Sequence, residues 1–255
     1  MNTSVQLNSP AGYGPVTPLD KTRHAGLGLK AGLDYRWCAG LNAMAVSVAE
    51  FARAALDYPL AFVRDPVSGL PLPVAVMGFQ QQNLFVDANG GWRRGTYVPA
   101  YVRRYPFCIA DVAAQGEEPE KRLVCMQEDR LEPSARPLFD SKGEPTAAWK
   151  PIQTLLEALE GARPQTRLLG ERLEALKLLT SFDALALPKG GQHLRLQGLF
   201  RVDEDKLKKL PAKDLRELLG KGYLRATYAH LLSLENFARL LDLAQDPPTA
   251  SPQGT

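Results

Sequence analysis

Two adjacent arginines, Arg103 and Arg104, are the residues of this chain best suited to hold a ligand. They lie in segment 97–107, which contains four aromatic residues and two prolines. Paired guanidinium groups beside tyrosines suit bidentate contacts with an anion and cation–π contacts. The proline, aromatic and β-branched content predicts a strand over residues 98–109, with packed tyrosines and the arginines at its margin. The candidate binding residues of this segment are Tyr101, Arg103, Arg104 and Tyr105.

In a regular strand, Arg103 and Arg104 point to opposite faces of the sheet. One of them then faces a more buried side, where an unpaired guanidinium would cost several kcal/mol. We therefore expect that arginine to have a carboxylate partner, an aromatic ring or a bound anion beside it.

A second set of polar residues lies near the C-terminus. Ser233 and Asn236 follow His230 by three and six positions, which places all three roughly along one side of a predicted helix. The trio would bind a polar ligand or form a buried hydrogen-bond network. We favour the network, because buried polar groups need partners.

Other chemical signatures are weak. The sequence contains no GxSxG elbow, P-loop or kinase motif. Gly26 and Gly28 match the letters of a dinucleotide fingerprint, but no apolar strand precedes them, which favours a turn. The cysteines Cys38, Cys108 and Cys125 lack CxxC spacing, which argues against zinc and against a disulfide framework. We predict buried thiols and leave open whether Cys108 meets Cys125 across adjacent strands. The sequence predicts no catalytic residue, no metal site and no cofactor.

The composition is typical of a soluble globular protein. Of the 255 residues, 45% are hydrophobic and 23% are charged, and the net charge of +3 is distributed among interleaved acidic and basic residues. Nucleic-acid binding is not expected, because it requires clustered Lys and Arg. No apolar run is long enough for a transmembrane segment, and residues 1–20 lack the apolar core of a secretory signal. We expect a cytoplasmic protein, with signal-independent export to the surface left open.

The pattern changes along the chain. Residues 1–18 are expected to form a flexible or extended arm and residues 245–255 a disordered tail. Between them we predict a single domain over residues 19–244, strand-rich at 19–146 and helix-rich at 147–244. Ser47 and Glu50 match a capping box at the start of a helix. The strands are predicted at residues 35–46, 60–63, 72–79, 83–86, 99–110 and 122–126, and residues 128–145 are predicted to be a long loop.

The helix-rich part has leucines at helical spacing. Gly161 and Pro164 are expected to break or kink its first helix. A β-hairpin is predicted near residues 184–202, a short helix at 212–219, and a well-buried last helix at 223–244 with apolar residues on more than one face. The short spacing between strands favours antiparallel pairing. We therefore predict an α+β fold, in which a mostly antiparallel sheet from the N-terminal part is covered by helices from the C-terminal part, with the hairpin as an extra element.

These segments together resemble the SapC family of bacterial proteins, named for a surface-layer-associated locus, over about residues 17–243. The resemblance rests on Asn42, Glu50-Phe51, Tyr58-Pro59, and residues 73–75, 83–86, 97–107, 137–140, 143–145 and 230–236. It departs from the family at Gly161 and Pro164, where a smoother helix is expected. The resemblance implies surface-layer biology but no particular reaction or ligand.

We expect a non-catalytic accessory or binding protein, related to surface-layer-associated proteins, that acts through protein–protein contacts. Its expected partner is a protein, and its oligomeric state is left open. The alternative is an enzyme or small-ligand-binding protein with a polar site near Arg103, Arg104 and His230. An enzyme should have a pocket of roughly 300 Å³ or more with convergent polar groups. An accessory protein should instead have an exposed apolar patch.

Overall fold

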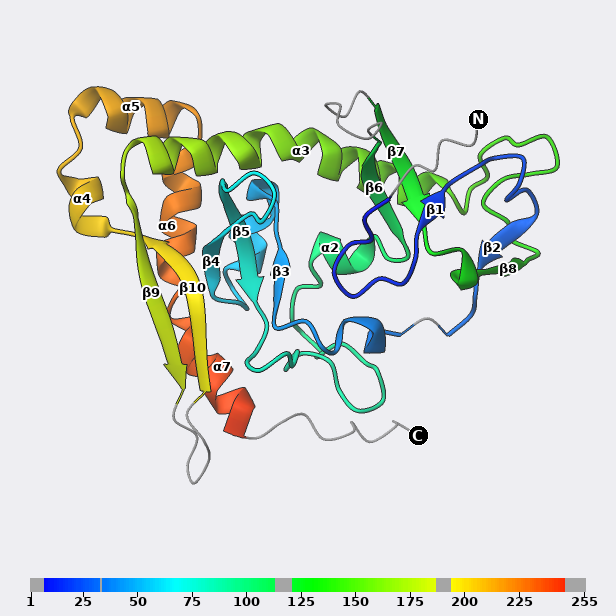
Figure 1. Ribbon diagram of the computed structural model, residues 1–255, viewed down its shortest axis with the longest axis horizontal. Coiled ribbons are helices and arrows are strands. Elements are labelled where there is room, and N and C mark those ends of the chain that lie inside the picture. The colour runs from blue at the N-terminus through cyan, green and yellow to red at the C-terminus, as the bar shows by residue number, and fades with distance from the viewer. Residues whose placement is uncertain (1–6, 33, 113–120, 187–193, 246–255) are drawn as a thin grey trace. The chain divides into compact units, whose positions relative to one another are not determined.

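The computed structural model describes residues 7–32, 34–112, 121–186 and 194–245 (Figure 1). Its antiparallel sheets and helices confirm the α+β fold (Figure 1). The chain forms two compact units: unit 1 consists of Met1–Trp37 and Val102–Glu160, and unit 2 of Cys38–Tyr101 and Gly161–Thr255. The single domain over residues 19–244 stays a prediction. Residues 1–6 of the expected arm and 246–255 of the expected tail lie outside the described residues.

Unit 2 contains a five-stranded sheet with the order β3-β5-β4-β10-β9, in which every pairing is antiparallel. The strands are β3 (Ala43–Ala45), β4 (Leu60–Arg64), β5 (Pro71–Val76), β9 (Leu179–Ala186) and β10 (Leu194–Val202). The predicted hairpin is therefore not a separate element, because β10 pairs with β4 through Phe200 and Phe62. Strands from both ends of the sequence thus share one sheet.

The helices of the C-terminal part complete unit 2. They are α4 (Glu204–Lys208), α5 (Ala212–Gly220), α6 (Tyr223–Ser233) and α7 (Asn236–Gln245). The buried residues of α6 recur at helical spacing, and this helix lies against β4 and β10 (Figure 1). Near the N-terminal strands, the 3-10 helix η2 (Val48–Glu50) leads into α1 (Phe51–Ala54), which also contacts α6.

Unit 1 contains two small antiparallel sheets, ordered β1-β7-β6 and β2-β8. The strands are β1 (Thr17–Pro18), β2 (Leu27–Leu29), β6 (Phe107–Val112), β7 (Lys121–Met126) and β8 (Leu131–Pro133). The expected arm thus ends in a strand, and Val16 beside it is buried. The expectation of a long loop over residues 128–145 is wrong at its start, where the 3-10 helix η3 (Glu128–Arg130) leads into β8.

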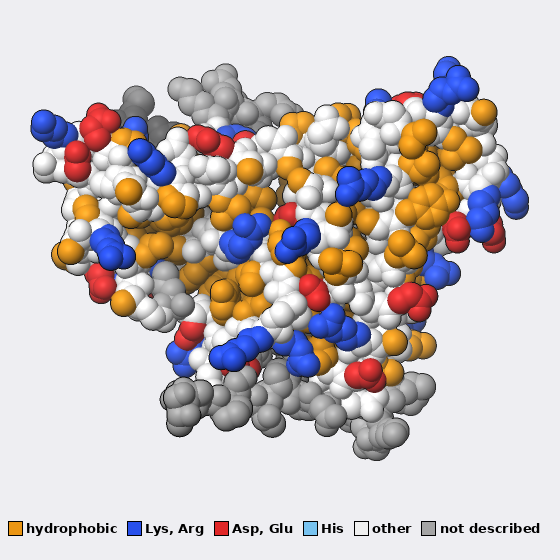
Figure 2. Space-filling view, turned by 180° about the vertical axis from the view of Figure 1, so that it is seen from behind, with side chains coloured by type: hydrophobic (Ala, Val, Ile, Leu, Met, Phe, Trp, Pro, Cys, Tyr) orange, Lys and Arg blue, Asp and Glu red, His pale blue; other side chains and the backbone are white. Residues whose placement is uncertain are grey.

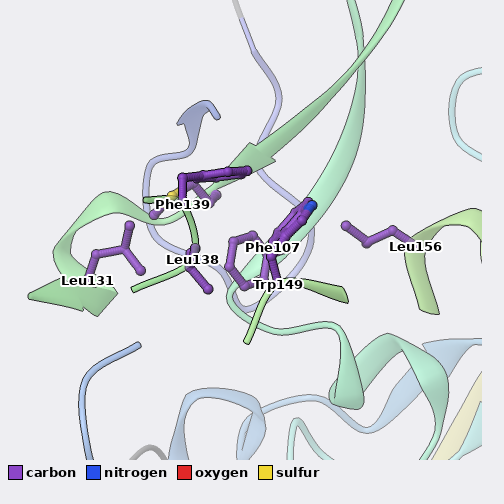
Figure 3. Packing of buried hydrophobic residues seen from close by; sticks show 7 residues of the cluster. Phe107, Leu131, Leu138, Phe139, Trp149 and Leu156 are labelled. Carbon is purple, nitrogen blue, oxygen red and sulfur yellow. The ribbon is translucent and has the colours of Figure 1, made fainter. Parts of the chain in front are cut away.

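An aromatic cluster forms the core of unit 1 (Figure 3). Trp149 packs edge-on against Phe107, with ring centroids 5.4 Å apart, and lies 5.3 Å from Phe139. Leu131, Leu138 and Leu156 also belong to this cluster (Figure 3). Its members come from β6, from β8 and the chain after it, and from the first part of α3 (Lys150–Ala175), so segments distant in sequence form one core.

The sequence left open whether Cys108 meets Cys125 across adjacent strands, and in the structure it does. They are directly opposite each other in the β6–β7 ladder, both are buried, and neither forms a disulfide. Burial raises the pKa of the Cys108 thiol to about 11 and also raises the pKa of Cys125. Both groups therefore stay protonated at neutral pH and are poor nucleophiles.

The strand predicted over residues 98–109 is wrong for residues 98–106 and confirmed for residues 107–109. Residues Ala100–Arg103 form a short helix, α2, and a strand begins only at Phe107. The backbone N–H of Ala100 donates to the Glu50 carboxylate, which holds the start of this helix. Tertiary hydrogen bonding therefore overrides the strand propensity of the aromatic residues.

Two helix boundaries also differ from expectation. Helix α3 is continuous through Gly161 and Pro164, because a proline removes only one backbone hydrogen bond and buried leucines lie on both sides of it. The helix predicted over residues 223–244 is divided after Ser233. There the Ser233 hydroxyl donates to the His230 carbonyl, and the Leu234 N–H bonds to Leu231 instead.

Two of the predicted strands are also shorter or absent. Of residues 35–46, only Ala43–Ala45 pair as a strand, and residues 83–86 form a turn with an isolated bridge between Val86 and Trp92. Asn83 explains the turn, because its side-chain oxygen accepts a hydrogen bond from the backbone N–H of Phe85 at 3.0 Å. Such local side-chain bonds compete with strand pairing.

Candidate functional site

Glu50 lies at the centre of a buried polar network in unit 2. One carboxylate oxygen accepts from the backbone N–H and the hydroxyl of Ser47, at 3.1 and 3.0 Å. The other accepts from the Tyr97 hydroxyl at 2.9 Å and from the Ala100 N–H at 2.7 Å. The predicted capping box is therefore confirmed, and Glu50 additionally holds the start of the arginine–tyrosine segment.

Asp57 and Tyr58 hold the same segment from a second side. The Tyr58 hydroxyl donates to the Tyr97 carbonyl, and one Asp57 oxygen accepts from the Tyr97 N–H at 2.8 Å. The other Asp57 oxygen pairs with Arg239 at 3.1 Å. Burial raises the pKa of Tyr58, which keeps its phenol protonated and a donor. The motif residues around positions 50, 58 and 97 thus meet in one structural network.

His230 bridges two strands of the unit 2 sheet. Its Nε2 accepts from the Val202 N–H at 3.0 Å, and its Nδ1–H donates to the Leu60 carbonyl at 2.9 Å. The pairing of Phe200 with Phe62 places Val202 opposite Leu60, so the imidazole stands where a direct ladder bond would otherwise form. The ring has no exposed surface, and burial lowers its pKa to about 4.

Ser233 and Asn236 extend this network. The Ser233 hydroxyl accepts from the Leu60 N–H at 2.9 Å and donates to the His230 carbonyl at 2.6 Å. The Asn236 amide donates to the Ala55 carbonyl at 2.8 Å. The structure therefore joins His230 and Ser233 in one hydrogen-bond network, whereas Asn236 satisfies a separate backbone carbonyl. A role for these residues in ligand binding stays a prediction.

The residues of the arginine–tyrosine segment are divided between the two units along the chain, up to Tyr101 in unit 2 and from Val102 in unit 1. Arg103 is exposed, whereas Arg104, Tyr101 and Tyr105 are half-buried, and Tyr101 belongs to unit 2. Tyr105 stacks on Trp37, with ring centroids 4.3 Å apart. Its hydroxyl donates to the Gln127 side chain at 3.4 Å. Tyr105 thus contributes to the packing of unit 1, and binding by the four residues stays a prediction.

Sequence reasoning missed a pocket in unit 1. It has a volume of about 450 Å³ and opens to solvent. Its lining consists of Leu29, Ser134, Ala135, Arg136, Leu138 and Ala148. The only sequence signal near it is the family motif over residues 137–140 and 143–145, which does not match any catalytic or ligand-binding motif.

The walls of the pocket are positioned by backbone hydrogen bonds and one close approach. The Ser134 N–H donates to the Gly26 carbonyl at 3.1 Å, and the Leu138 N–H donates to the Leu27 carbonyl at 2.8 Å. Between them, a Cβ atom on Gly28 would lie 2.7 Å from the Arg136 carbonyl oxygen. Only glycine therefore lets residues 134–136 lie across β2.

The family motif closes the other side of the pocket. One Asp140 oxygen accepts from the N–H groups of Lys142 and Glu144, at 2.8 and 2.9 Å, which forms a tight turn. The Thr146 hydroxyl then donates to the Pro137 carbonyl at 2.6 Å. These bonds place Leu138 and Ala148 on the same wall, although ten positions separate them.

The lining of the pocket suits binding more than catalysis. Four of its six residues are apolar, and the Ser134 hydroxyl accepts from the Arg136 N–H at 3.1 Å. Among the described residues, the exposed Arg136 guanidinium has no ion pair. The lining holds no carboxylate or imidazole to act as a general base. An apolar group with a neighbouring negative charge fits this combination.

Metal-binding groups and membrane-spanning helices are both absent from the described residues. Within the described ranges, no three His, Cys, Asp or Glu side chains gather as a metal-binding group. None of the helices in the described parts of the chain combines the length and apolar character needed to cross a membrane.

Comparison with known proteins places these motifs in a family. No curated protein and no solved structure matches the chain. The SapC family matches residues 19–240, which include the Glu50 and His230 networks and the pocket lining. The chain therefore belongs to the SapC family.

Proposed function

We propose that this SapC-family protein is a non-catalytic accessory or binding protein that acts through protein–protein contacts. In this proposal, the pocket of unit 1 accepts an apolar side chain of a partner protein. Arg136 pairs with an aspartate or glutamate next to that side chain. The observation that carries the proposal is the pocket lining, which combines four apolar residues with a cation that has no ion pair among the described residues.

The chemistry of the lining supports binding over turnover. A catalytic pocket needs a nucleophile activated by a base, or an acid and a base in reach of one substrate. Ser134 is the only hydroxyl of the lining, and a backbone N–H donates to it. An apolar pocket with one charged residue at its side is typical of sites that anchor a side chain.

The alternative is an enzyme or small-ligand-binding protein, and the pocket volume of about 450 Å³ favours it in one respect. That volume lies within the range of small-molecule pockets. However, the lining contains none of the residues expected for the alternative, which were Arg103, Arg104 and His230. A short fatty acid such as octanoate tests this alternative. Thermal stabilisation by octanoate, with no enrichment of peptides, would support it over the protein-binding proposal.

Selection from a displayed random-peptide library tests the proposal directly. We expect enriched peptides to contain a large apolar residue next to Asp or Glu. Ala148→Trp fills the pocket and Arg136→Glu reverses its charge, so each should weaken binding of a selected peptide by about tenfold or more. Fluorescence anisotropy with a labelled peptide measures this effect.

Two matched variants control for the added bulk and the changed charge. Ala147→Trp adds the same bulk at the exposed neighbouring position, and Arg216→Glu makes the same charge change on an exposed part of α5. Both should bind the peptide as the wild type does. Equal binding by the wild type and Ala148→Trp would refute the proposed site.

A further inference from the structure

The two-stranded sheet beside the pocket has an edge with unused backbone groups. The Lys30 N–H donates to the Arg130 carbonyl at 3.0 Å, which fixes the alternation of hydrogen bonds between β2 and β8. Leu29 is opposite Leu131, at a position where the two strands do not bond to each other. The N–H and C=O of Leu29 therefore point away from β8. Neither group has a hydrogen-bond partner among the described residues.

This outer edge of β2 is occupied two residues earlier in the chain. The Leu27 carbonyl accepts from the Leu138 N–H at 2.8 Å, and the Leu27 N–H donates to the His24 carbonyl at 3.2 Å. The pairing stops before Leu29, which also lines the pocket. The outer edge of β8 differs, because Pro133 has no N–H to donate to a further strand. A strand can therefore be added beside the pocket on β2.

One residue of an extended peptide satisfies both free groups of Leu29. In an antiparallel ladder, the two residues of a bonded pair exchange both of their backbone hydrogen bonds. The side chains of such a pair lie on the same face of the sheet. The Leu29 side chain lines the pocket and packs against the aromatic cluster of unit 1. The peptide residue opposite Leu29 therefore has its side chain on the apolar side of the pocket.

The next residue of the peptide points to the other face of the sheet. Gly28 marks that face, because a Cβ atom there would lie 2.7 Å from the Arg136 carbonyl oxygen. Residues 134–136 thus lie on the face opposite to the Leu29 side chain, and the Arg136 side chain is exposed. An apolar residue followed or preceded by an acidic one fits this arrangement in an extended chain. In a helix, adjacent side chains are only about 100° apart and do not reach opposite faces.

The charge of the surface fits a single acidic side chain better than a polyanion. On the face that Figure 2 presents, lysine and arginine side chains are scattered among hydrophobic and acidic ones (Figure 2). The net charge of the whole chain is only +3. Nucleic acids are bound by clustered basic residues instead. An acidic residue of a protein segment is therefore the anion that suits Arg136.

We propose that the partner segment binds as an added antiparallel β-strand on the outer edge of β2. Its apolar residue exchanges both backbone bonds with Leu29 and fills the pocket, and the adjacent Asp or Glu pairs with Arg136. This inference rests on the protein-binding function proposed above, and it specifies the conformation of the partner. In strand addition of this kind, main-chain bonds provide affinity and alternate side chains provide specificity.

N-methylated versions of one peptide selected from the library test the added strand. A methyl group on the amide of the apolar residue removes the N–H that donates to the Leu29 carbonyl. It should weaken binding by about tenfold or more. The same methyl group on the adjacent Asp or Glu is the matched control, because that amide points away from β2. It should change the dissociation constant by no more than about threefold, as measured by fluorescence anisotropy.

Hydrogen exchange of the Leu29 amide gives a second measurement, by NMR. Saturation with the unmodified peptide should slow this exchange by about tenfold or more, because the amide gains an acceptor. Strand addition is overturned if methylation of the apolar residue weakens binding no more than the control does. Binding that leaves the exchange of Leu29 unchanged would also overturn it, while the pocket proposal would stand. A library that yields no binding peptide would refute both.

Discussion

In unit 2, the side-chain oxygens of Glu50 and both ring nitrogens of His230 have hydrogen-bond partners. In unit 1, the pocket has apolar walls and an exposed arginine that lacks an ion pair among the described residues. The family motifs therefore differ in what they do for the structure. Those of unit 2 join distant parts of the chain, and those of unit 1 shape a pocket that opens to solvent. This difference predicts that variants in unit 2 lose stability, whereas variants at the pocket lose binding.

The largest expected loss of stability follows Glu50→Ala. The change removes the acceptor for Ser47, Tyr97 and Ala100, and leaves buried donors unsatisfied. We expect the free energy of unfolding to fall by about 3–5 kcal/mol, as measured by urea denaturation. Glu204→Ala, which removes an exposed carboxylate paired with Lys208, should change it by about 0.5 kcal/mol or less. Similar losses in both variants would contradict a structural role for Glu50.

His230 should make the stability of the protein depend on pH. Its pKa is about 4 in the folded state against 6.5 in the unfolded state, so the unfolded state binds more protons between these values. The free energy of unfolding should therefore fall as the pH falls, by about 1.4 kcal/mol per unit and about 3 kcal/mol in total.

The variant His230→Gln separates this contribution from that of the carboxylates. It lacks the titrating ring, so its loss of stability between pH 6.5 and 4 should be smaller than that of the wild type by about 3 kcal/mol. Denaturation of both proteins at several pH values measures the difference. Parallel curves for the two proteins would show that the ring is not held neutral by burial.

Two glycine-to-alanine substitutions, one beside the pocket and one in α3, should change the free energy of unfolding in opposite directions. Gly28→Ala forces residues 134–136 away from β2 and should cost about 1–3 kcal/mol while weakening peptide binding. Gly161→Ala meets no atom within 4 Å and lies inside α3, so it should stabilise the protein by about 0.5–1 kcal/mol. Thermal denaturation of both variants measures the signs. A neutral Gly28→Ala would argue against the close approach.

The smallest expected effect on stability is that of Arg136→Ala. The side chain is exposed, so the free energy of unfolding should change by no more than about 0.5 kcal/mol. Peptide binding should nevertheless weaken, which urea denaturation and fluorescence anisotropy together would establish. A loss of several kcal/mol would show that Arg136 stabilises the fold of unit 1 and would contradict a role confined to binding.

The sequence predicted those features that depend on neighbouring residues. The strands near residues 60–64, 71–76 and 121–126 and the hairpin of β9 and β10 follow from local apolar patterns and turns. The capping box of Ser47 and Glu50 likewise involves residues three positions apart. The family resemblance also rested on such short segments, and it is confirmed over residues 19–240.

The predictions that were wrong, and the pocket that was missed, depend on contacts that local sequence patterns do not show. In the first part of the strand expected over residues 98–109, a short helix forms instead, held by Glu50, which is 50 positions from Ala100. The last helix is divided where Ser233 bonds to the His230 carbonyl instead of leaving it to the backbone. The pocket joins residues from Leu29 to Ala148, and no periodicity links them.

The sequence by itself therefore determined the α+β class, the antiparallel pairing, most of the helices and the family. Only the tertiary structure decided which strands share a sheet, where His230 stands and where a pocket opens. The physical reason is that backbone propensity and apolar periodicity act over a few residues. Hydrogen bonds such as that from His230 to Leu60, 170 positions away, depend on how the whole chain packs.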